Sequence, residues 1–467
     1  MNIRELSTFK EVINYLLEKK CEYVKVGITD IDGVIRGKYM HVQKFFKSLE
    51  DGFGFCDVIF GWDSSDDLIG FTSSEYKDVF TGWKTGYQDV KVRVIPSSGR
   101  ISPFEENIPF FLCELEIAEI CPRGTLRRIL SKYADKGLTA KTSLEYEFFL
   151  FKESPTSLRD KDYKNLLPFT PGMYGYSILR SSVESDLYQK ILSMCSIMDM
   201  QLEGLHTETG PGVLEGAISY DEAMNSADKA TLFKTFIKIL AQKNDLLANF
   251  MAKWSEHYPG QSGHIHCSIW NESNEPIFKI ADNNHFSKEL NFFIGGLQKY
   301  MKEFCVMLAP TVNSYQRLMP GAWAPNSLTW GIENRTAGFR VINGNPPSQR
   351  VENRLPGADA NPYLALAATL GAGFLGIEEQ ISPSQETDGN AYYQKLEKEQ
   401  LTPKDLKEAT NLFKNSKAAK KLFGKTFVNH YSASREWEYQ KFKESKKPTF
   451  ENGKISHWEL KRYFEII

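Results

Sequence analysis

Two glutamates share one face of a segment that is otherwise suited to the interior of a sheet. In SLEYEFFLF, a strand would place Glu145 and Glu147 on one face and Tyr146, Phe148 and Leu150 on the other. Adjacent like charges on an apolar strand are unfavourable unless something positive lies between them. A divalent cation would satisfy both carboxylates, and a solvated strand face is the alternative. The segment therefore predicts a sheet with one apolar face and one acidic face.

Further candidate ligands occur in segments that are expected to form neighbouring strands. HTETGPGVLEG places Glu208 and Glu215 on two strands joined by a Gly-Pro-Gly turn, although a plain hairpin with exposed acids is also possible. SGHIHCS places His264 and His266 on one strand face, where a single histidine is more often a core residue. The candidate ligand set is Glu145, Glu147, Glu208, Glu215, His264 and Glu352. Mostly oxygen ligands favour Mg²⁺ or Mn²⁺ over a structural zinc.

A later stretch is rich in arginine. Five arginines and no lysine lie between Arg317 and Arg354, although the chain as a whole prefers lysine. Arginine grips carboxylate or phosphate with two parallel hydrogen bonds and stays charged when partly buried. RVENR would place Arg350, Glu352 and Arg354 on one strand face, with a surface ion-pair ladder as the alternative. Metal-binding carboxylates together with arginines indicate phosphoryl transfer. The sequence has no P-loop and no GxGxxG turn, so any nucleotide must be held by the metal and the arginines.

Composition excludes several classes of partner. A net charge of -2 over 467 residues gives no electrostatic case for binding nucleic acid or a membrane surface, so small ligands are expected. No apolar run is long enough to span a membrane and the first residues do not resemble a signal peptide, which predicts a cytoplasmic protein. The seven cysteines form no CxxC pair and are expected to be reduced thiols. The pattern of elements predicts a small β-rich unit over residues 1–105 and a larger unit over 106–467.

Six segments resemble, in order and spacing, the motifs of the glutamine synthetase family, type I, and the resemblance covers nearly the whole chain. They are SLEYEFFLF, HTETGPGVLEG, SGHIHCS, NSYQRLMPG, NRTAGFR and RVENRLPGADANPYLALAA. The resemblance implies an α+β fold with a β-grasp N-terminal domain over residues 1–105. The catalytic domain over 106–467 would then be built on a curved antiparallel sheet with flanking helices. It also implies a homo-oligomer, a dodecamer of two hexameric rings with active sites between subunits.

The same resemblance implies roles for individual residues. The first metal would be held by Glu147, Glu208 and Glu215, and the second, which bridges the ATP phosphates, by Glu145, His264 and Glu352. Phosphate would be bound by Arg335, Arg340 and Arg350, with Arg340 also catalytic. Nucleotide would contact Glu203, His266 and Ser268, and glutamate would contact Gly260, Arg317 and Arg354. Each site would use ATP and two or three Mg²⁺ or Mn²⁺ ions, and an amine would displace phosphate from a γ-glutamyl phosphate.

The acceptor end departs from the pattern of glutamine-forming members, which bind ammonium with a loop acid, a serine pair and a flap glutamate. Here the flap reads PGAWAP, with Trp323 at the place of the glutamate, and the loop reads CDVIF, with Asp57 but no serine pair. Pro259 stands where the family usually has an asparagine that contacts glutamate. Burying ammonium without a partner is costly, so an alkyl or aryl amine, or a polyamine, fits better.

The C-terminal segments HYSASREWEYQKFK and ISHWELKRYFEII also resemble the branch of the family that makes γ-glutamyl amides of organic amines. We therefore predict an ATP-dependent ligase that joins glutamate to an organic amine. The alternatives are an ammonium-dependent glutamine synthetase and a non-catalytic structural paralogue. All six metal-matching residues are intact, which argues against the structural paralogue.

Overall fold

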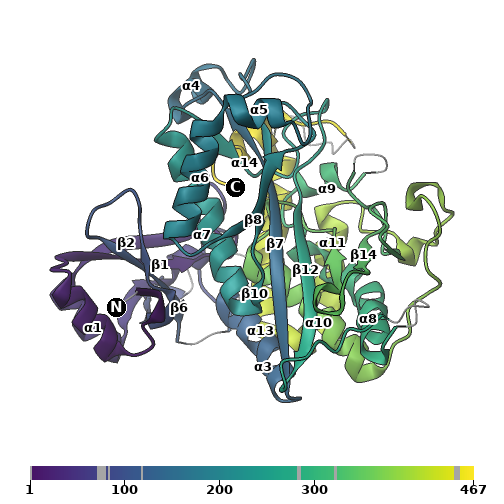
Figure 1. The fold of residues 1–467 in the computed structure, drawn as a ribbon, viewed down its shortest axis with the longest axis horizontal. Helices are drawn as coiled ribbons and strands as arrows, with labels where there is room; N and C mark the ends of the chain where they lie inside the picture. Colours follow the sequence, from purple (N-terminus) through teal and green to yellow (C-terminus); the bar gives the residue numbers. More distant parts are fainter. Residues whose placement is uncertain are drawn as a thin grey trace.

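The protein folds into two sheets with helices packed against them, and the smaller sheet lies beside the larger one (Figure 1). The structure is a computed structural model that describes residues 3–70, 80–82, 85–116, 119–280, 286–319, 323–445 and 453–467. Both helices and antiparallel strands contribute to the larger unit, so the predicted α+β class is confirmed. Within the described residues, no helix is long and apolar enough to cross a membrane.

The smaller sheet has six strands in the order β2-β1-β6-β4-β3, with β5 paired to β6. Its strands are β1 (Tyr23–Thr29), β2 (Ile35–His41), β3 (Phe53–Cys56), β4 (Asp89–Val94), β5 (Arg100–Ile101) and β6 (Pro109–Leu115), and its helices are α1 (Phe9–Glu18) and α2 (Val42–Asp51). The sequence Ile31-Asp32-Gly33 predicts an Asp-Gly turn between two strands, and this turn joins β1 to β2. Gly33 there has a φ of +88°, which glycine adopts without strain. That this unit is a β-grasp domain stays a prediction.

Two features of the smaller unit differ from expectation. The segment GFGFCDVIFGWDSSDDL, whose glycines and acidic residues predict a loop, contains β3 and a short 3-10 helix, Asp57–Phe60, because Ile59 and Phe60 are buried in the core of this unit. The division predicted at residue 105 falls before β6, which pairs in parallel with β1 and antiparallel with β4. A division after Leu115 would keep this sheet in one piece.

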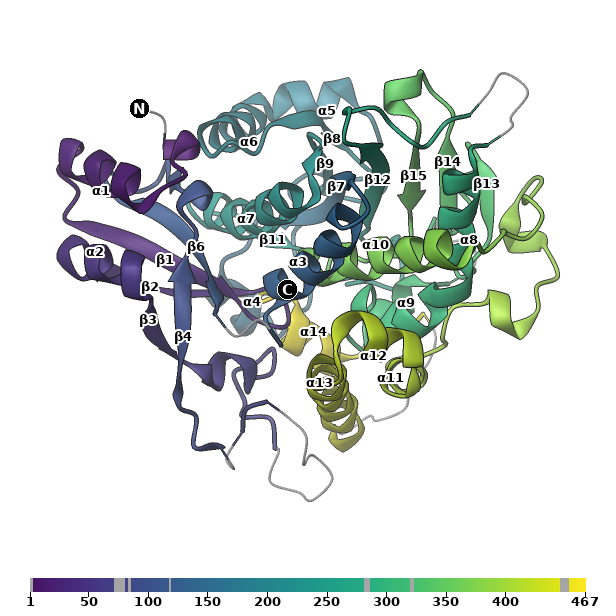
Figure 2. The ribbon, with the colours of Figure 1, turned by 90° about the horizontal axis from the view of Figure 1, so that it is seen from below.

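The larger sheet has nine strands and follows the order β13-β14-β15-β12-β7-β9-β8, with β10 and β11 also paired to β7. Figure 2 shows its strands along an arc, with helices below them. All pairs are antiparallel except β13 with β14. The strands are β7 (Leu138–Phe151), β8 (Leu202–Thr207), β9 (Val213–Ile218), β10 (Asp221–Glu222), β11 (Leu247–Asn249), β12 (Gly263–Asn271), β13 (Trp330–Ile332), β14 (Phe339–Ile342) and β15 (Arg350–Asn353).

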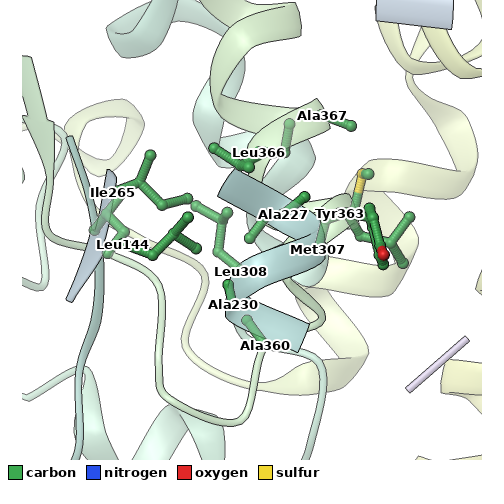
Figure 3. Close-up of a cluster of buried hydrophobic side chains, with 14 of the residues drawn as sticks. Leu144, Ala227, Ala230, Ile265, Met307, Leu308, Ala360, Tyr363, Leu366 and Ala367 are labelled. Atoms are coloured by element: carbon green, nitrogen blue, oxygen red, sulfur yellow. The ribbon is translucent and has the colours of Figure 1, made fainter. Parts of the chain in front are cut away.

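Helices cover one face of the larger sheet, and the predicted alternation along β7 explains which face. Leu144 of β7 and Ile265 of β12 point toward Ala227 and Ala230 of α7 and Leu366 of α10 (Figure 3). The helices of this unit are α3 (Pro122–Ala134), α4 (Pro155–Asp160), α5 (Ile178–Val183), α6 (Ser185–Ile197), α7 (Ala223–Gln242), α8 (Lys288–Phe304), α9 (Ser314–Arg317), α10 (Pro362–Glu379), α11 (Leu406–Asn415), α12 (Lys417–Phe423), α13 (Lys425–Glu444) and α14 (His457–Tyr463). The odd-numbered glutamates of β7 are thereby left on the opposite, acidic face.

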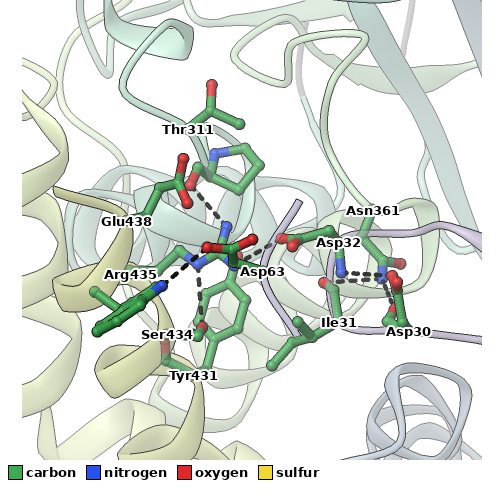
Figure 4. Close-up of polar contacts among 12 residues, drawn as sticks. Asp30, Ile31, Asp32, Asp63, Thr311, Asn361, Tyr431, Ser434, Arg435 and Glu438 are labelled. Atoms are coloured by element: carbon green, nitrogen blue, oxygen red, sulfur yellow. Dashed lines mark hydrogen bonds and ion pairs between the residues drawn. The ribbon is translucent and has the colours of Figure 1, made fainter. Parts of the chain in front are cut away.

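Polar contacts fix the β1–β2 turn against the larger unit (Figure 4). Arg435 of α13 lies 2.6 Å from Asp32 Oδ1, and both side chains are buried. Asn361 caps the start of α10 and donates from Nδ2 to the carbonyl oxygens of Asp30 and Ile31 at 3.1 and 3.2 Å. Breaking a buried ion pair of this kind leaves an uncompensated charge, so the two units are held in one arrangement.

Candidate active site

A cavity of about 620 Å³ opens on the acidic face of the larger sheet. The strands β7, β8, β9, β12, β14 and β15, together with the segments that flank them, supply most of its polar lining. The predicted site residues that line it are Glu145, Glu147, Glu208, Glu215, Gly260, His264, His266, Trp323, Arg335, Arg340, Arg350, Glu352 and Arg354. The fold therefore brings most of the predicted site together from segments far apart in the sequence.

Three acids form one end of the cavity. Glu147 of β7 lies opposite Glu215 of β9 in the strand register, and Glu208 follows directly after β8. The Ser262 N–H donates to Glu147 Oε2 at 2.7 Å, and His206 Nε2 lies 3.3 Å from Glu215 Oε1. Burial and the neighbouring carboxylates raise the pKa of Glu147, and burial raises the pKa of Glu215. This end of the cavity has an excess of negative charge.

A second group combines two acids with a histidine. Glu145, His266 and Glu352 each offer a ligand atom, and the three atoms lie within 4.8 Å of one another. Burial opposes ionisation of Glu352, but nearby His266, Arg354 and His264 outweigh it and lower its pKa to about 2. The sequence places His264 rather than His266 in this group. His264 is buried, and its Nδ1 has no hydrogen-bond partner within the described part of the chain, so its role as a ligand stays a prediction.

Arginines close the opposite side of the cavity. Arg340 on β14 lies opposite Glu352 on β15, and its Nη1 donates to Oε2 at 3.0 Å. Arg350 donates from Nε to His266 Nδ1 at 3.1 Å, so a neutral His266 ring carries its proton on Nε2, toward Glu145. Arg335 is exposed in the turn between β13 and β14. The cavity thus has an acidic end and a cationic end.

Arg317 lies beneath the cavity and does not line it. Its Nη2 donates to Ser262 Oγ at 2.8 Å and to the Arg354 carbonyl oxygen at 3.1 Å, and the residue is 1% exposed. Gly260 forms the floor above it, where an added Cβ would lie 2.7 Å from Arg317 Cγ. Arg317 therefore positions the floor, and its predicted contact with glutamate stays a prediction.

Three further predicted residues lie outside the cavity lining. Glu203 is exposed on β8, and Ser268 on β12 accepts a hydrogen bond from Trp270 Nε1 at 2.8 Å. Asp57 is buried within the smaller unit, and burial raises its pKa. The predicted roles of these residues would need a nucleotide that extends along β12 and β8, or a neighbouring subunit.

Two aromatic side chains stand at the cavity, and only one of them was expected. Trp323 lines it and is 60% exposed; the three flap residues before it, 320–322, lie outside the described residues. Tyr176 also lines it and stacks on His206 with ring centroids 4.4 Å apart. Its backbone N–H donates to the Thr207 carbonyl oxygen at 2.7 Å. Sequence analysis missed Tyr176 because it lies outside any strand or helix and follows no periodic pattern.

The residues present fit a divalent cation at the acidic end. Glu147 and Glu215 are held side by side, and within the described residues no lysine or arginine nitrogen lies within 4.0 Å of either carboxylate. Oxygen donors clustered in this way suit Mg²⁺ or Mn²⁺. The cationic end, by contrast, already compensates Glu352 with arginines and suits an anionic substrate group.

Carboxylates that suit divalent cations and arginines that suit phosphate lie in one cavity, which is the equipment of phosphoryl transfer. Residues 119–463 match the family described as glutamine synthetase, catalytic domain. The chain therefore belongs to the glutamine synthetase family, as its motifs predict, and it is an enzyme of the ligase class. Members of this family generally use ATP and divalent metals, act on small molecules and usually form oligomers.

Individual relatives carry different names. The chain is 40% identical to type-1 glutamine synthetase 2 of Dictyostelium discoideum, over 98% of this chain and 86% of that protein. It is 32% identical to the glutamate–isopropylamine ligase of a Pseudomonas species, over 98% of each chain. A solved structure titled as a GmaS complex with ADP has the same fold, with a TM-score of 0.78 at 24% identity, over 96% of this chain and 98% of that one.

Proposed function

We propose that the protein is an ATP-dependent ligase that forms a γ-glutamyl amide from glutamate and an organic amine. The observation that carries this proposal is the aromatic wall of the cavity, where Trp323 and Tyr176 are both largely exposed. Aromatic faces attract alkylammonium groups and contribute apolar area, whereas a small hydrated cation needs carboxylates or hydroxyls. The name of the isopropylamine ligase relative supports the same class of acceptor.

In the first half of the proposed reaction, the γ-carboxylate of glutamate attacks the terminal phosphate of ATP and releases ADP. Arg340, Arg335 and Arg350 at the cationic end would bind the transferred phosphate, which carries its charge on equatorial oxygens. Bound Mg²⁺ or Mn²⁺ would neutralise the remaining phosphate charge and be held by the glutamates of the cavity and by His264 or His266. Arg340 keeps its orientation through the hydrogen bond to Glu352.

In the second half, the amine attacks the carbonyl carbon of γ-glutamyl phosphate and phosphate leaves. The amine must lose a proton during this attack. The glutamates that line the cavity are assigned to the metal ions, so they are not available to take this proton. We therefore assign Asp57 of a neighbouring subunit as the group that acts on the acceptor amine. This assignment requires the oligomer that we also propose, a dodecamer of two hexameric rings in the cytoplasm.

Ammonium-dependent glutamine synthesis is the second candidate. It is favoured by the name of the Dictyostelium relative, which shares more sequence identity than the isopropylamine ligase does. Trp323 distinguishes the two candidate functions. It occupies the flap position at which an ammonium site would need a carboxylate.

Glutamate labelled with ¹⁸O in its γ-carboxylate tests the proposed chemistry. Incubation with ATP, Mg²⁺ and an alkylamine should give a γ-glutamyl amide by mass spectrometry and move one ¹⁸O into inorganic phosphate. Amide formation without transfer of the label would exclude the acyl phosphate route. Absence of amide with glutamate, but product with another acid, would refute the assignment of the acid substrate.

A further inference from the structure

A second cavity, of about 770 Å³, lies at the junction of the two units. The β1–β2 turn, α7, α14 and residues 465–467 border it, together with the loop that contains Ser64. In Figure 2, α4, α14 and the C-terminus lie next to the ends of β1 and β2. Its cationic residues are Arg159, Lys234, Lys238, Lys243, Lys461 and Arg462, and its acidic side chains are Asp32, Asp66 and Glu465.

The acidic side chains of this cavity are already paired with arginines. Asp32 pairs with Arg435 at 2.6 Å. Asp66 lies 2.7 Å from an Arg36 nitrogen. Glu465 lies 2.5 Å from Arg159. These pairs leave the four lysines of the cavity without a carboxylate within 4.0 Å in the described part of the chain.

Of these lysines, Lys234 is buried and Lys238 is half-buried, and both have little compensation. Lys234 is 8% exposed, and the hydrogen bond recorded for its Nζ is a long one, 3.4 Å to the Ala360 carbonyl oxygen. Lys238 lies one helical turn further along α7, and its Nζ donates to the Ile466 carbonyl oxygen at 2.8 Å. An ammonium group has three donors, so both retain donors for a ligand. Buried charges are normally paired, because removing them from water is costly.

We propose that this cavity binds an anion whose phosphate or carboxylate group lies between the ammonium groups of Lys234 and Lys238. Lys243 and Lys461 at the exposed rim would attract the anion and contact its second charged group. The site is separate from the catalytic cavity, since no residue lines both.

The proposed site adjoins the back of the catalytic strand. Lys234 Nζ lies 5.8 Å from the ring centroid of Tyr146, which stands on β7 between Glu145 and Glu147. An anion that draws the ammonium group away from this ring would change the packing behind the acidic face.

Isothermal titration calorimetry of the full chain tests the site, with inorganic phosphate and succinate as probes and ionic strength held constant with KCl. We expect at least one probe to bind, and the stronger probe identifies phosphate or carboxylate as the recognised group. Lys234→Met should lower its affinity by about tenfold or more, because a charge-assisted hydrogen bond is lost. Lys238→Met should do the same. Arg340→Ala, which alters the catalytic cavity, should leave this binding event intact.

Lys229→Met is the matched control, because Lys229 is a buried lysine of the same helix that pairs with Asp221 at 2.8 Å and does not line the cavity. Its affinity for the probe should equal that of the unchanged protein. If the interior variants fail to fold, Lys243→Met and Lys461→Met at the rim should still weaken binding several-fold. Binding of neither probe, or equal affinity in the Lys234, Lys238 and rim variants, would overturn the proposal.

Discussion

Glu147 of β7 and Glu215 of β9 lie directly opposite one another in the strand register of the catalytic sheet. Burial and mutual repulsion keep the pKa of Glu147 above its ordinary value, and burial does the same for Glu215. Such an arrangement is unfavourable by itself. It becomes favourable when a divalent cation lies between the two carboxylates.

Replacing Glu147 by Gln should therefore have opposite effects with and without metal. In a chelating buffer at about pH 9, above the raised Glu147 pKa of about 8, the variant should unfold at a higher temperature than the unchanged protein, because one buried charge is removed. With Mg²⁺ or Mn²⁺, the unchanged protein should gain about 2.7 kcal/mol at a hundredfold excess over the dissociation constant, and the variant should gain much less. Differential scanning calorimetry in both buffers measures this. An equal metal response in the two proteins would contradict the assignment.

Changing Glu352 to Ala should abolish turnover in Mg²⁺. The ligand atoms of Glu352, Glu145 and His266 lie within 4.8 Å of one another, and the change removes the first of them. It also removes the carboxylate to which Arg340 donates a hydrogen bond. The matched control is Glu333→Gln, because Glu333 pairs with the same arginine but does not line the cavity. Steady-state phosphate release should stay close to normal in the control. A Glu352→Ala enzyme with near-normal rates would refute the role of Glu352.

Changing Trp323 to Glu should create the capacity to use ammonium. The new carboxylate would stand at the cavity wall and compensate the small cation, while the loss of the indole should weaken binding of alkylamines. Trp323→Phe keeps an aromatic face and serves as the control, with amine preference retained. Initial rates with ammonium and with an alkylamine give the comparison. If Trp323→Glu gains no ammonium activity, Trp323 does not select the acceptor.

The stability of the folded protein should fall in mild acid, in part because of His430. Burial lowers the pKa of His430 from 6.5 to about 4, although the hydrogen bond to the Phe60 carbonyl oxygen acts to raise this pKa. In the unfolded chain, His430 binds a proton below its ordinary pKa of 6.5. In the folded protein its ring stays neutral until the pH approaches the lowered pKa of about 4. The contribution of His430 is therefore complete above pH 6.5 and is lost as the pH falls toward 4.

A His430→Gln variant should show a shallower loss of stability over that range, by about 1.4 kcal/mol per pH unit. Urea unfolding at a series of pH values provides the measurement. Parallel pH profiles for the two proteins would show that His430 is not a source of the acid sensitivity.

Much of the catalytic cavity could be predicted from sequence, because it rests on strand periodicity. Alternation along β7 places Glu145 and Glu147 opposite the buried side chains of the same strand, as observed. The same rule places His264 and His266 on one face of β12, but it does not say which ring turns toward Glu352. That choice depends on the Arg350 hydrogen bond to His266, which comes from another strand.

Features that depend on long-range pairing could not be predicted in the same way. The parallel pairing of β6 with β1 joins segments separated by more than seventy residues, so local patterns do not indicate that β6 belongs to the smaller sheet. Lys234 and Lys238 occur in SADKATLFKTFIKILAQKNDLLANF, whose apolar spacing predicts a helix that serves core packing, and no local pattern shows that they border a cavity. Asp57 is buried away from the catalytic cavity of its own chain, so the role we propose for it requires the proposed assembly.

The most direct test of the proposed function is the rate of phosphate release from ATP and glutamate with each of a panel of amines. The panel should include ammonium, isopropylamine, ethanolamine and a polyamine, at matched concentrations of the free base. The aromatic wall formed by Trp323 and Tyr176 predicts a higher kcat/KM for at least one organic amine than for ammonium. Equal or better turnover with ammonium than with every organic amine would contradict the account.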